Sequence, residues 1–181
     1  MGIYTVLDCF SGYGGFGLGL RLAYPDADFK KVCYIEWDKY CQRVIQARIE
    51  DGHLDDAPLW GGDIRDFDGK PWRGTVDILS AGFPCQPHSN AGLRKGADDD
   101  RNLWPDTLRI IREVAPRTGI LLENVPGILV GNGERAAYGG TVVGQLSEIG
   151  YMSEWAVISA ADAGAPHLRN RWWLLAHSPS G

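Results

Sequence analysis

The sequence has no long hydrophobic run. Its longest apolar stretches, such as ILLENV and RWWLLAH, fall far short of the roughly 20 residues that a membrane-spanning helix needs. No basic region precedes the apolar part of the N-terminus MGIYTVLDCF, so no secretory signal is predicted. These absences exclude a membrane partner and favour the cytoplasm as the location.

Cysteine is also scarce, and its spacing excludes the usual metal sites. The 4 cysteines form no C-x-x-C pair and no zinc-like pattern, so we predict no metal centre and expect free thiols. Cys9, Cys33 and Cys41 fall within strand or helix patterns and are expected to be buried packing residues. Cys85 differs, because it stands between two prolines in the segment GFPCQP.

An excess of positive charge is absent as well. The formal net charge is −5; residues 1–90 hold 9 basic and 13 acidic side chains (net −4), and residues 91–181 hold 9 and 10 (net −1). A protein that grips nucleic acid alone usually carries a basic face. Any such grip must therefore come from a local patch or from a part that this chain lacks.

The order of apolar segments predicts a single α/β domain over residues 1–181, since this length suits one core. Strand patterns alternate with helical ones, which favours a doubly wound, Rossmann-like and mostly parallel sheet. Only ten residues join the last two strands, so these should be antiparallel. The expected strands are 3–10, 31–37, 56–64 (weak), 75–82, 119–125, 151–160 and 171–177; the expected helices are 15–24, 38–50, 102–115 (with the helix proper starting at Pro105) and 133–150.

The unusual polar residues follow the ends of these strands. In a doubly wound sheet, ligands bind beyond the carboxyl ends of the parallel strands. The segments DCFSGYGGFG, IEW, GGDI, GFPCQP and ENVP all open onto that edge, and the loop DAGAPHLRNR before an antiparallel final strand opens there too. The sequence therefore predicts one site along this rim.

The glycine turn GYGGFG matches G-x-G-x-x-G through Gly12, Gly14 and Gly17, and Glu36 follows the next strand. Such a turn with a ribose-binding carboxylate is typical of dinucleotide enzymes. A pocket for S-adenosylmethionine needs the same parts, together with an aromatic residue and a further acid for the adenine; Trp37 and Asp63 supply these. A third explanation is structural: the glycines would allow close packing of the chain and bind no ligand.

Seven segments together resemble the cytosine-5 DNA methyltransferase family. They occur in family order from Tyr4 to about His177: DCFSGYGG, YIEWDKY, GGDIRDF, GFPCQPHSNAG, DDRNLWPDTLRIIREVAPR, LLENVPGI and GAPHLRNRWWLLA. A proline–cysteine–glutamine turn followed by Glu–Asn–Val at the next strand is highly specific for this family. A dinucleotide-binding oxidoreductase would leave Cys85 and Glu123 without a role.

The resemblance implies an S-adenosylmethionine-dependent methyltransferase fold and a role for each rim residue. Cys85 is the implied nucleophile, which adds to carbon 6 of cytosine, and Glu123 is the implied acid at the ring N3. Arg169 and Arg171 would hold the cytosine O2 and support both groups. Asn124 is expected to orient its loop rather than perform chemistry. By the same resemblance the cofactor pocket is lined by Phe10, Gly12, Gly14, Gly15, Glu36, Trp37, Asp63 and Leu103.

The two prolines beside Cys85 fit this role. Pro84 fixes its own backbone φ, and Pro87 restricts Gln86, so the thiol is carried on a stiff turn. The implied partner is DNA whose target cytosine swings out of the duplex to meet that thiol. Family members occur in restriction–modification systems, in the cytoplasm of bacterial or phage-infected cells.

Relative to the family, the chain is expected to be a catalytic domain truncated at its C-terminus. The target recognition domain and the C-terminal motifs that normally follow are absent after RWWLLAHSPSG. Three explanations stay open: a fragmentary gene product, one half of a split enzyme whose second chain carries the recognition domain, or an inactive remnant that binds cofactor or a partner. A transfer-RNA cytosine-5 methyltransferase is a further alternative.

Overall fold

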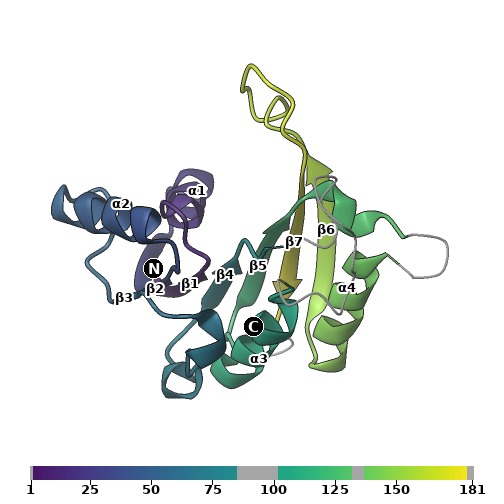
Figure 1. Ribbon diagram of the computed structural model, residues 1–181, viewed down its shortest axis with the longest axis horizontal. Helices are drawn as coiled ribbons and strands as arrows, with labels where there is room; N and C mark the ends of the chain where they lie inside the picture. The colour runs from purple at the N-terminus through teal and green to yellow at the C-terminus, as the bar shows by residue number, and fades with distance from the viewer. Residues whose placement is uncertain (1, 85–101, 132–136, 179–181) are drawn as a thin grey trace.

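A computed structural model describes residues 2–84, 102–131 and 137–178 (Figure 1). Cys85 and Pro87 lie outside the described residues, as does the first part of the helix expected over 133–150. Within the described residues, no helix is both long and apolar enough to cross a bilayer.

The described strands form one sheet of seven strands in the order β3-β2-β1-β4-β5-β7-β6. Neighbouring strands from β3 to β5 are parallel, whereas β7 is antiparallel to both β5 and β6. The doubly wound sheet and the antiparallel final pair are therefore confirmed. The strands are β1 (Ile3–Cys9), β2 (Asp28–Ile35), β3 (Leu59–Trp60), β4 (Ile78–Ala81), β5 (Gly119–Asn124), β6 (Met152–Ile158) and β7 (Arg171–His177).

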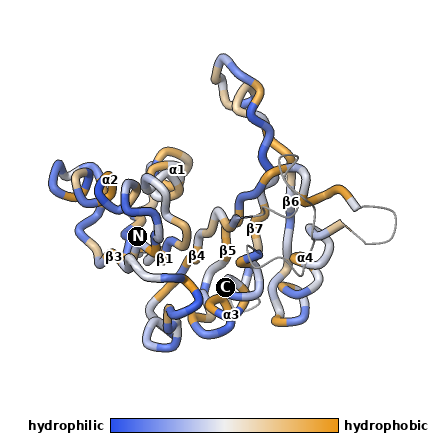
Figure 2. The backbone as a smooth tube through the Cα atoms, in the orientation of Figure 1, coloured by the Kyte–Doolittle hydropathy of each residue, from blue (hydrophilic) through white to orange (hydrophobic). Residues whose placement is uncertain are grey.

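Helices pack on both faces of this sheet, with α1 and α2 on one side and α3 and α4 on the other (Figure 1). Short 3₁₀ turns complete the connections. The α-helices are α1 (Gly15–Ala23), α2 (Lys39–Glu50), α3 (Trp104–Val114) and α4 (Tyr138–Glu148); the 3₁₀ turns are η1 (Ile64–Asp66), η2 (Lys70–Trp72) and η5 (Pro126–Leu129). Figure 2 shows that α1 is largely hydrophobic whereas α2 is largely hydrophilic.

Element boundaries differ from the sequence expectation by a few residues. Helix α3 begins at Trp104, one residue before Pro105, because a proline is tolerated anywhere in the first turn, where backbone N–H groups have no helical partner. The weak third strand shrinks to Leu59–Trp60, and β2 begins earlier than expected, at Asp28.

The main core lies between the sheet and helices α3 and α4. Leu7, Leu79 and Leu122 from three strands pack with Ile111 of α3 and Leu146 of α4, all essentially without exposure. Each such side chain contributes about 1.5–3 kcal/mol by leaving water. This layer fixes the strands whose carboxyl ends form the rim.

Two of the three cysteines that were expected to pack are buried. Cys9 and Cys33 lie in the main core, where burial raises the pKa of both thiols. The expectation was wrong for Cys41, which is only half-buried. Its place in the first turn of α2 explains this, because that turn lies at the surface, where the Asp38 side chain caps it by accepting from the backbone N–H groups of Tyr40 and Cys41.

Candidate functional site

The glycine turn after β1 bends sharply and is tied to the neighbouring strand. Phe10, Gly12 and Gly14 have φ angles of 55°, 54° and 82°, a left-handed region that costs a residue with a side chain about 1–3 kcal/mol. Ser11 anchors the turn: its N–H donates to the Ile35 carbonyl at 3.0 Å, and its hydroxyl donates to the Asp8 carbonyl at 2.8 Å. The turn is thus held in a single shape at the end of β1.

Glu36 joins the second strand to this turn. Its Oε2 accepts from the Gly12 N–H at 2.7 Å, and its Oε1 accepts from the Asp38 N–H at 2.7 Å. The residue is buried, so these charge-assisted bonds are stronger than exposed ones. The structure therefore brings together the glycine turn and the acid that the sequence assigned to one pocket.

Three other residues assigned to the cofactor pocket are arranged differently. Trp37 follows Glu36 and is 66% exposed. Asp63 caps η1 by accepting from the Arg65 N–H at 3.0 Å and lies 3.3 Å from the Arg65 guanidinium. Leu103 is the residue before α3 and packs against the main core. None of the three contacts Glu36 through a hydrogen bond that the structure describes.

Glu123 and Arg171 form an ion pair at the end of β5. The Arg171 Nε lies 2.7 Å from the Glu123 Oε1, and both side chains are partly buried. Burial raises the pKa of Glu123, while the positive charges of Arg171 and Arg169 partly oppose that rise. Glu123 is therefore a carboxyl that holds a proton more readily than an exposed glutamate.

The start of the turn that carries Cys85 is fixed beside this pair. The Asn124 side-chain amide donates to the Phe83 carbonyl at 2.9 Å, and its oxygen accepts from the Val125 N–H at 2.8 Å. A Cβ added to Gly82 would lie 3.4 Å from Glu123 Oε2, which shows how near the β4 exit runs to that carboxylate. Cys85 itself lies outside the described residues, two positions beyond Phe83.

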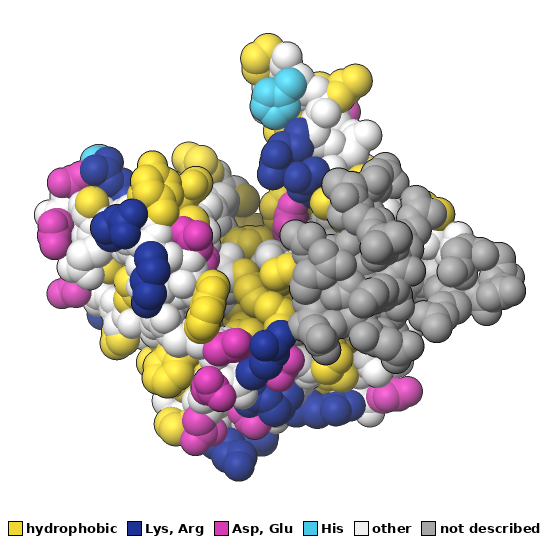
Figure 3. All heavy atoms as spheres, in the orientation of Figure 1, with side chains coloured by type: hydrophobic (Ala, Val, Ile, Leu, Met, Phe, Trp, Pro, Cys, Tyr) yellow, Lys and Arg dark blue, Asp and Glu magenta, His cyan; other side chains and the backbone are white. Residues whose placement is uncertain are grey.

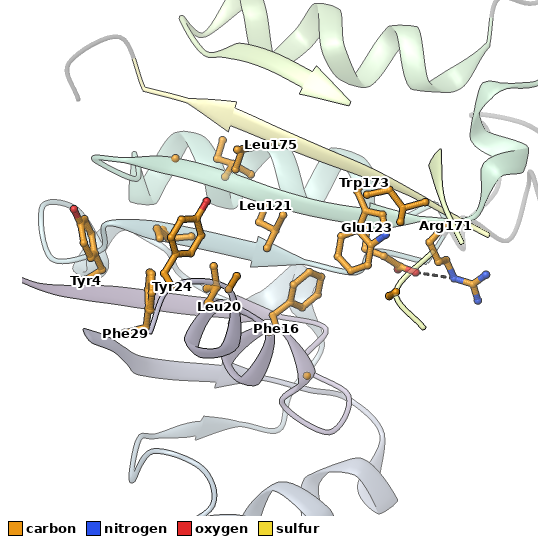
Figure 4. Close-up of a pocket in the computed structure, with 18 of the residues that line it drawn as sticks. Tyr4, Phe16, Leu20, Tyr24, Phe29, Leu121, Glu123, Arg171, Trp173 and Leu175 are labelled. Carbon is orange, nitrogen blue, oxygen red and sulfur yellow. Dashed lines mark ion pairs between the residues drawn. The ribbon is translucent and has the colours of Figure 1, made fainter. Parts of the chain in front are cut away.

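A cavity of about 950 Å³ extends from the glycine turn to the Glu123–Arg171 pair. Phe10 and Gly15 of the glycine turn line it, as do Glu123, Arg169 and Arg171. Figure 4 shows the Glu123–Arg171 pair at one end of this cavity. The space-filling view shows a hollow with a hydrophobic floor at the same place (Figure 3). The other assigned cofactor residues, Gly12, Gly14, Glu36, Trp37, Asp63 and Leu103, do not line the cavity.

Two features of the site were missed from the sequence. Phe16 of α1 meets Trp173 of β7 edge-on, with ring centroids 5.9 Å apart, so the two rings bridge the cavity beside Glu123. The position of Phe16 directly after the glycine turn was the available signal.

The second missed feature is an ion pair buried beneath α1. Lys31 Nζ lies 3.0 Å from Asp8 Oδ2, and the Ser80 hydroxyl donates to Asp8 Oδ1 at 2.5 Å. A Cβ on Gly17 would meet the Lys31 side chain at 2.7 Å, so the last glycine of the motif makes room for the lysine rather than for a ligand. Burial raises the pKa of Asp8, against the effect of Lys31.

The fold is a Rossmann-like α/β fold of the methyltransferase type. Its strand order and antiparallel β7 define this class, together with a glycine turn at the carboxyl ends of the parallel strands. The family model for the C-5 cytosine-specific DNA methylases matches residues 4–180. The chain therefore belongs to the C-5 cytosine-specific DNA methylase family.

Known relatives agree with this assignment. The chain is 34% identical over 173 residues to the Type II methyltransferase M.NgoMIV of Neisseria gonorrhoeae, which covers 96% of this chain and 51% of the relative. It is 36% identical over 180 residues to M.BsuFI of Bacillus subtilis, covering 97% and 39%. Among solved structures, the Dnmt2 methyltransferase of S. pombe matches with a TM-score of 0.70 at 26% identity, covering 97% of this chain and 51% of that one. The chain thus spans about half, or less, of the length of these proteins.

Proposed function

We propose that this chain is the catalytic half of a DNA cytosine-5 methyltransferase. The observation that carries the proposal is Glu123, a partly buried carboxyl with a raised pKa that lines the same cavity as the glycine turn. A proton donor beside a cofactor turn is what methylation of a pyrimidine carbon requires, because the ring must accept electrons before carbon 5 can react. Family membership supports the same chemistry.

The glycine turn fits S-adenosylmethionine, which when bound supplies a methyl group on a positively charged sulfur. A Cβ on Gly12 or Gly15 would meet no atom within 4 Å, so the backbone there faces open space that a ligand can enter. Each oxygen of the Glu36 carboxylate has a second lone pair beyond its bond to the Gly12 or Asp38 N–H, and we assign these lone pairs to the ribose hydroxyls. The exposed Trp37 ring is assigned to the adenine. The residues proposed to hold the cofactor are Phe10, Gly12, Gly14, Gly15, Glu36, Trp37, Asp63 and Leu103.

Cys85 is the proposed nucleophile. Its thiolate forms a bond to carbon 6 of the cytosine. The electrons of the carbon 5–carbon 6 double bond then form a double bond between carbon 5 and carbon 4, and the former carbon 4–N3 double-bond electrons take up a proton at N3. The resulting enamine is nucleophilic at carbon 5. An ordinary thiol has a pKa of about 8.5, so nearby cations are needed to raise its ionised fraction at neutral pH. Arg169 and Arg171, both at the cavity, are the candidates.

Glu123 completes the proton transfers. Its proton goes to N3 as the thiolate adds, and returns when the adduct collapses. After carbon 5 has gained the methyl group, a base removes the proton of carbon 5 and the bond between sulfur and carbon 6 breaks. This restores the aromatic ring and the thiolate. Arg171, already paired with Glu123, is placed to stabilise the carboxylate that exists between the two transfers.

The proposed substrate is DNA, and we propose that a further polypeptide segment is needed to bind it. The net charge of −5 gives this half little affinity for phosphates. A second chain, or a second half, with a basic recognition surface would supply that affinity and would hold the duplex while the cytosine flips out, at a cost of a few kcal/mol.

The direct test is methyl transfer from labelled S-adenosylmethionine to unmethylated DNA and, in a parallel assay, to transfer RNA. The chain is assayed alone and joined to the half of M.NgoMIV that it does not match. We expect 5-methylcytosine in DNA from the joined protein. Methylation of transfer RNA but not of DNA would favour a transfer-RNA cytosine-5 methyltransferase. Cofactor binding without any transfer, in either form, would favour the inactive remnant.

A further inference from the structure

Two aromatic rings lie beside the Glu123 carboxyl. Phe16 of α1 and Trp173 of β7 meet edge-on, with ring centroids 5.9 Å apart and ring planes at 79° to each other. Both residues line the cavity at the Glu123 end, and both are partly buried. The proton transfers proposed for Glu123 use neither ring.

The sheet register places Trp173 next to Glu123. The two residues are directly paired across β5 and β7, so their side chains point to the same face of the sheet. Directly opposed residues have Cβ atoms about 4.5–5.5 Å apart, which brings an indole ring within reach of a glutamate side chain. Trp173 therefore covers Glu123 from the neighbouring strand.

Phe16 approaches the same carboxyl from the helix. A Cβ built on Gly82 would lie 3.4 Å from Glu123 Oε2 and 3.6 Å from Phe16 Cε2. The carboxyl oxygen and the edge of the ring thus border the same small space, which Gly82 leaves open because it has no side chain. In Figure 4, Phe16 and Arg171 lie on opposite sides of Glu123. The carboxyl therefore stands between an apolar ring and a cation.

Two arginines are the charged groups of the described residues that act on Glu123. Arg171 of β7 and Arg169 of the preceding loop both favour the ionised carboxylate. The one charged residue of α1, Arg21, is paired with Asp55 instead, and the described part of the β4 exit carries no titratable side chain. Burial is nevertheless the largest influence and raises the pKa of Glu123. The groups that exclude water from this carboxyl therefore outweigh both arginines.

We propose that Phe16 and Trp173 are positioning residues for Glu123, whose rings exclude water from its carboxyl. A carboxyl shielded in this way holds its proton more readily, as transfer to N3 of the cytosine requires. This inference rests on the proposed role of Glu123 as the acid, but the shielding is measured without any methyl transfer. The competing explanation is that the two rings only pack α1 on the sheet.

The direct test is a carbon-13 NMR titration of the carboxyl groups in the chain, with Glu123→Gln identifying the Glu123 signal. Phe16→Ala and Trp173→Ala admit water, so each should lower the pKa of Glu123 and reduce its protonated fraction at neutral pH about threefold or more. Phe16→Leu keeps an apolar cover and should titrate much as the unchanged protein does. The matched controls are Leu22→Ala on α1 (84% exposed) and Trp155→Ala on β6 (53% exposed); neither residue lines the cavity, and neither variant should move the titration.

Gly82→Ala tests the shielding in the opposite direction and removes no packing. Its methyl group would enter the space between Glu123 Oε2 and Phe16 at ordinary contact distances, so it should raise the pKa of Glu123. This variant decides the outcome if circular dichroism shows that Phe16→Ala and Trp173→Ala do not fold.

A pH profile of the chain joined to the unmatched half of M.NgoMIV is the second measurement. The reaction needs protonated Glu123, so its rate falls as pH rises through the pKa of that group. In Phe16→Ala this fall should begin at a lower pH, and in Phe16→Leu the profile should be normal.

The titrations separate shielding from packing. Alanine variants that lower the Tm without moving the Glu123 titration, or Gly82→Ala with an unchanged pKa, would overturn the proposal. The expected titrations without any methyl transfer would support the shielding and contradict the proposed role of Glu123 as the acid.

Discussion

Arg171 Nε lies 2.7 Å from Glu123 Oε1, and this contact joins the first residue of β7 to the end of β5. The antiparallel pairing of the two strands sets Glu123 opposite Trp173, so Arg171 reaches the carboxylate from two residues away along β7. The register between β5 and β7 thus decides whether Glu123, the proposed acid, can pair with Arg171. Burial raises the pKa of Glu123 and the arginines restrain the rise.

Replacing Arg171 with methionine should raise the pKa of Glu123 further, because burial would then act without its main opposing charge. A carboxyl whose folded pKa exceeds its unfolded value stabilises the fold when protonated, and this stability is lost as pH rises through the folded pKa. The stability deficit of Arg171→Met should therefore be small near pH 4 and grow toward pH 7, as followed by thermal unfolding. In the Glu123→Gln background, Arg171→Met should show no such growth; if it does, another group is responsible.

Glu36→Gln should weaken S-adenosylmethionine binding about tenfold or more. The neutral amide keeps the shape of the side chain but lacks the charge that strengthens the bond to the Gly12 N–H and the proposed bond to the ribose, each worth about 1.5–3 kcal/mol. Calorimetric titration measures the change. Glu154→Gln, at an exposed position on β6, is the control and should bind normally. Equal affinity in both variants would remove Glu36 from the cofactor site.

Gly12→Ala should destabilise the protein by about 1–2 kcal/mol, since Gly12 has a φ of 54° that alanine adopts only with strain. Gly144→Ala is the matched control: it lies within α4, its φ is not positive, and a Cβ there meets no atom within 4 Å. We expect it to raise stability by about 0.5–1 kcal/mol. Denaturant unfolding compares the two, and effects of the same sign would contradict the strained turn.

Much of the rim was predictable because each of its residues belongs to a short motif at a strand end. The doubly wound sheet places those ends together, which brings Glu36 to the glycine turn and Glu123 to the same rim. The support of Glu123 by Arg171 was implied by the family resemblance. The buried Lys31 was not predictable, since lysine is almost always exposed and nothing in the segment KKVCYIE marks which lysine turns inward. Nor was the cavity between α1 and β7, because an apolar strand such as RWWLLAH does not show which of its faces is fully packed.

The Lys31–Asp8 pair should behave as a buried ion pair. Lys31→Met leaves a buried carboxylate without its partner and should cost about 3–5 kcal/mol. The double variant Asp8→Asn, Lys31→Met should recover most of that loss. Arg21→Met removes the cation of the partly exposed ion pair between Arg21 of α1 and Asp55 and should cost no more than about 1 kcal/mol. Chemical denaturation of all three variants is the measurement; a double variant as unstable as Lys31→Met would contradict this explanation.

Cys85→Ala should abolish methyl transfer and leave S-adenosylmethionine binding nearly unchanged, because the proposed thiol touches the base and not the cofactor. Binding is measured by calorimetry and transfer with labelled cofactor, both on the protein joined to the unmatched half of M.NgoMIV. Loss of cofactor binding in this variant would make Cys85 a structural residue instead.

Trapping the covalent intermediate is the most direct test that Cys85 and Glu123 act on a single cytosine. DNA that carries 5-fluorocytosine cannot release the enzyme after methylation, because fluorine cannot leave carbon 5 as a proton does. With S-adenosylmethionine present, mass spectrometry of the joined protein should find a peptide cross-linked through Cys85, forming at least a hundredfold more slowly in Glu123→Gln. A cross-link at another residue, no cross-link at all, or an unchanged rate in Glu123→Gln would contradict it.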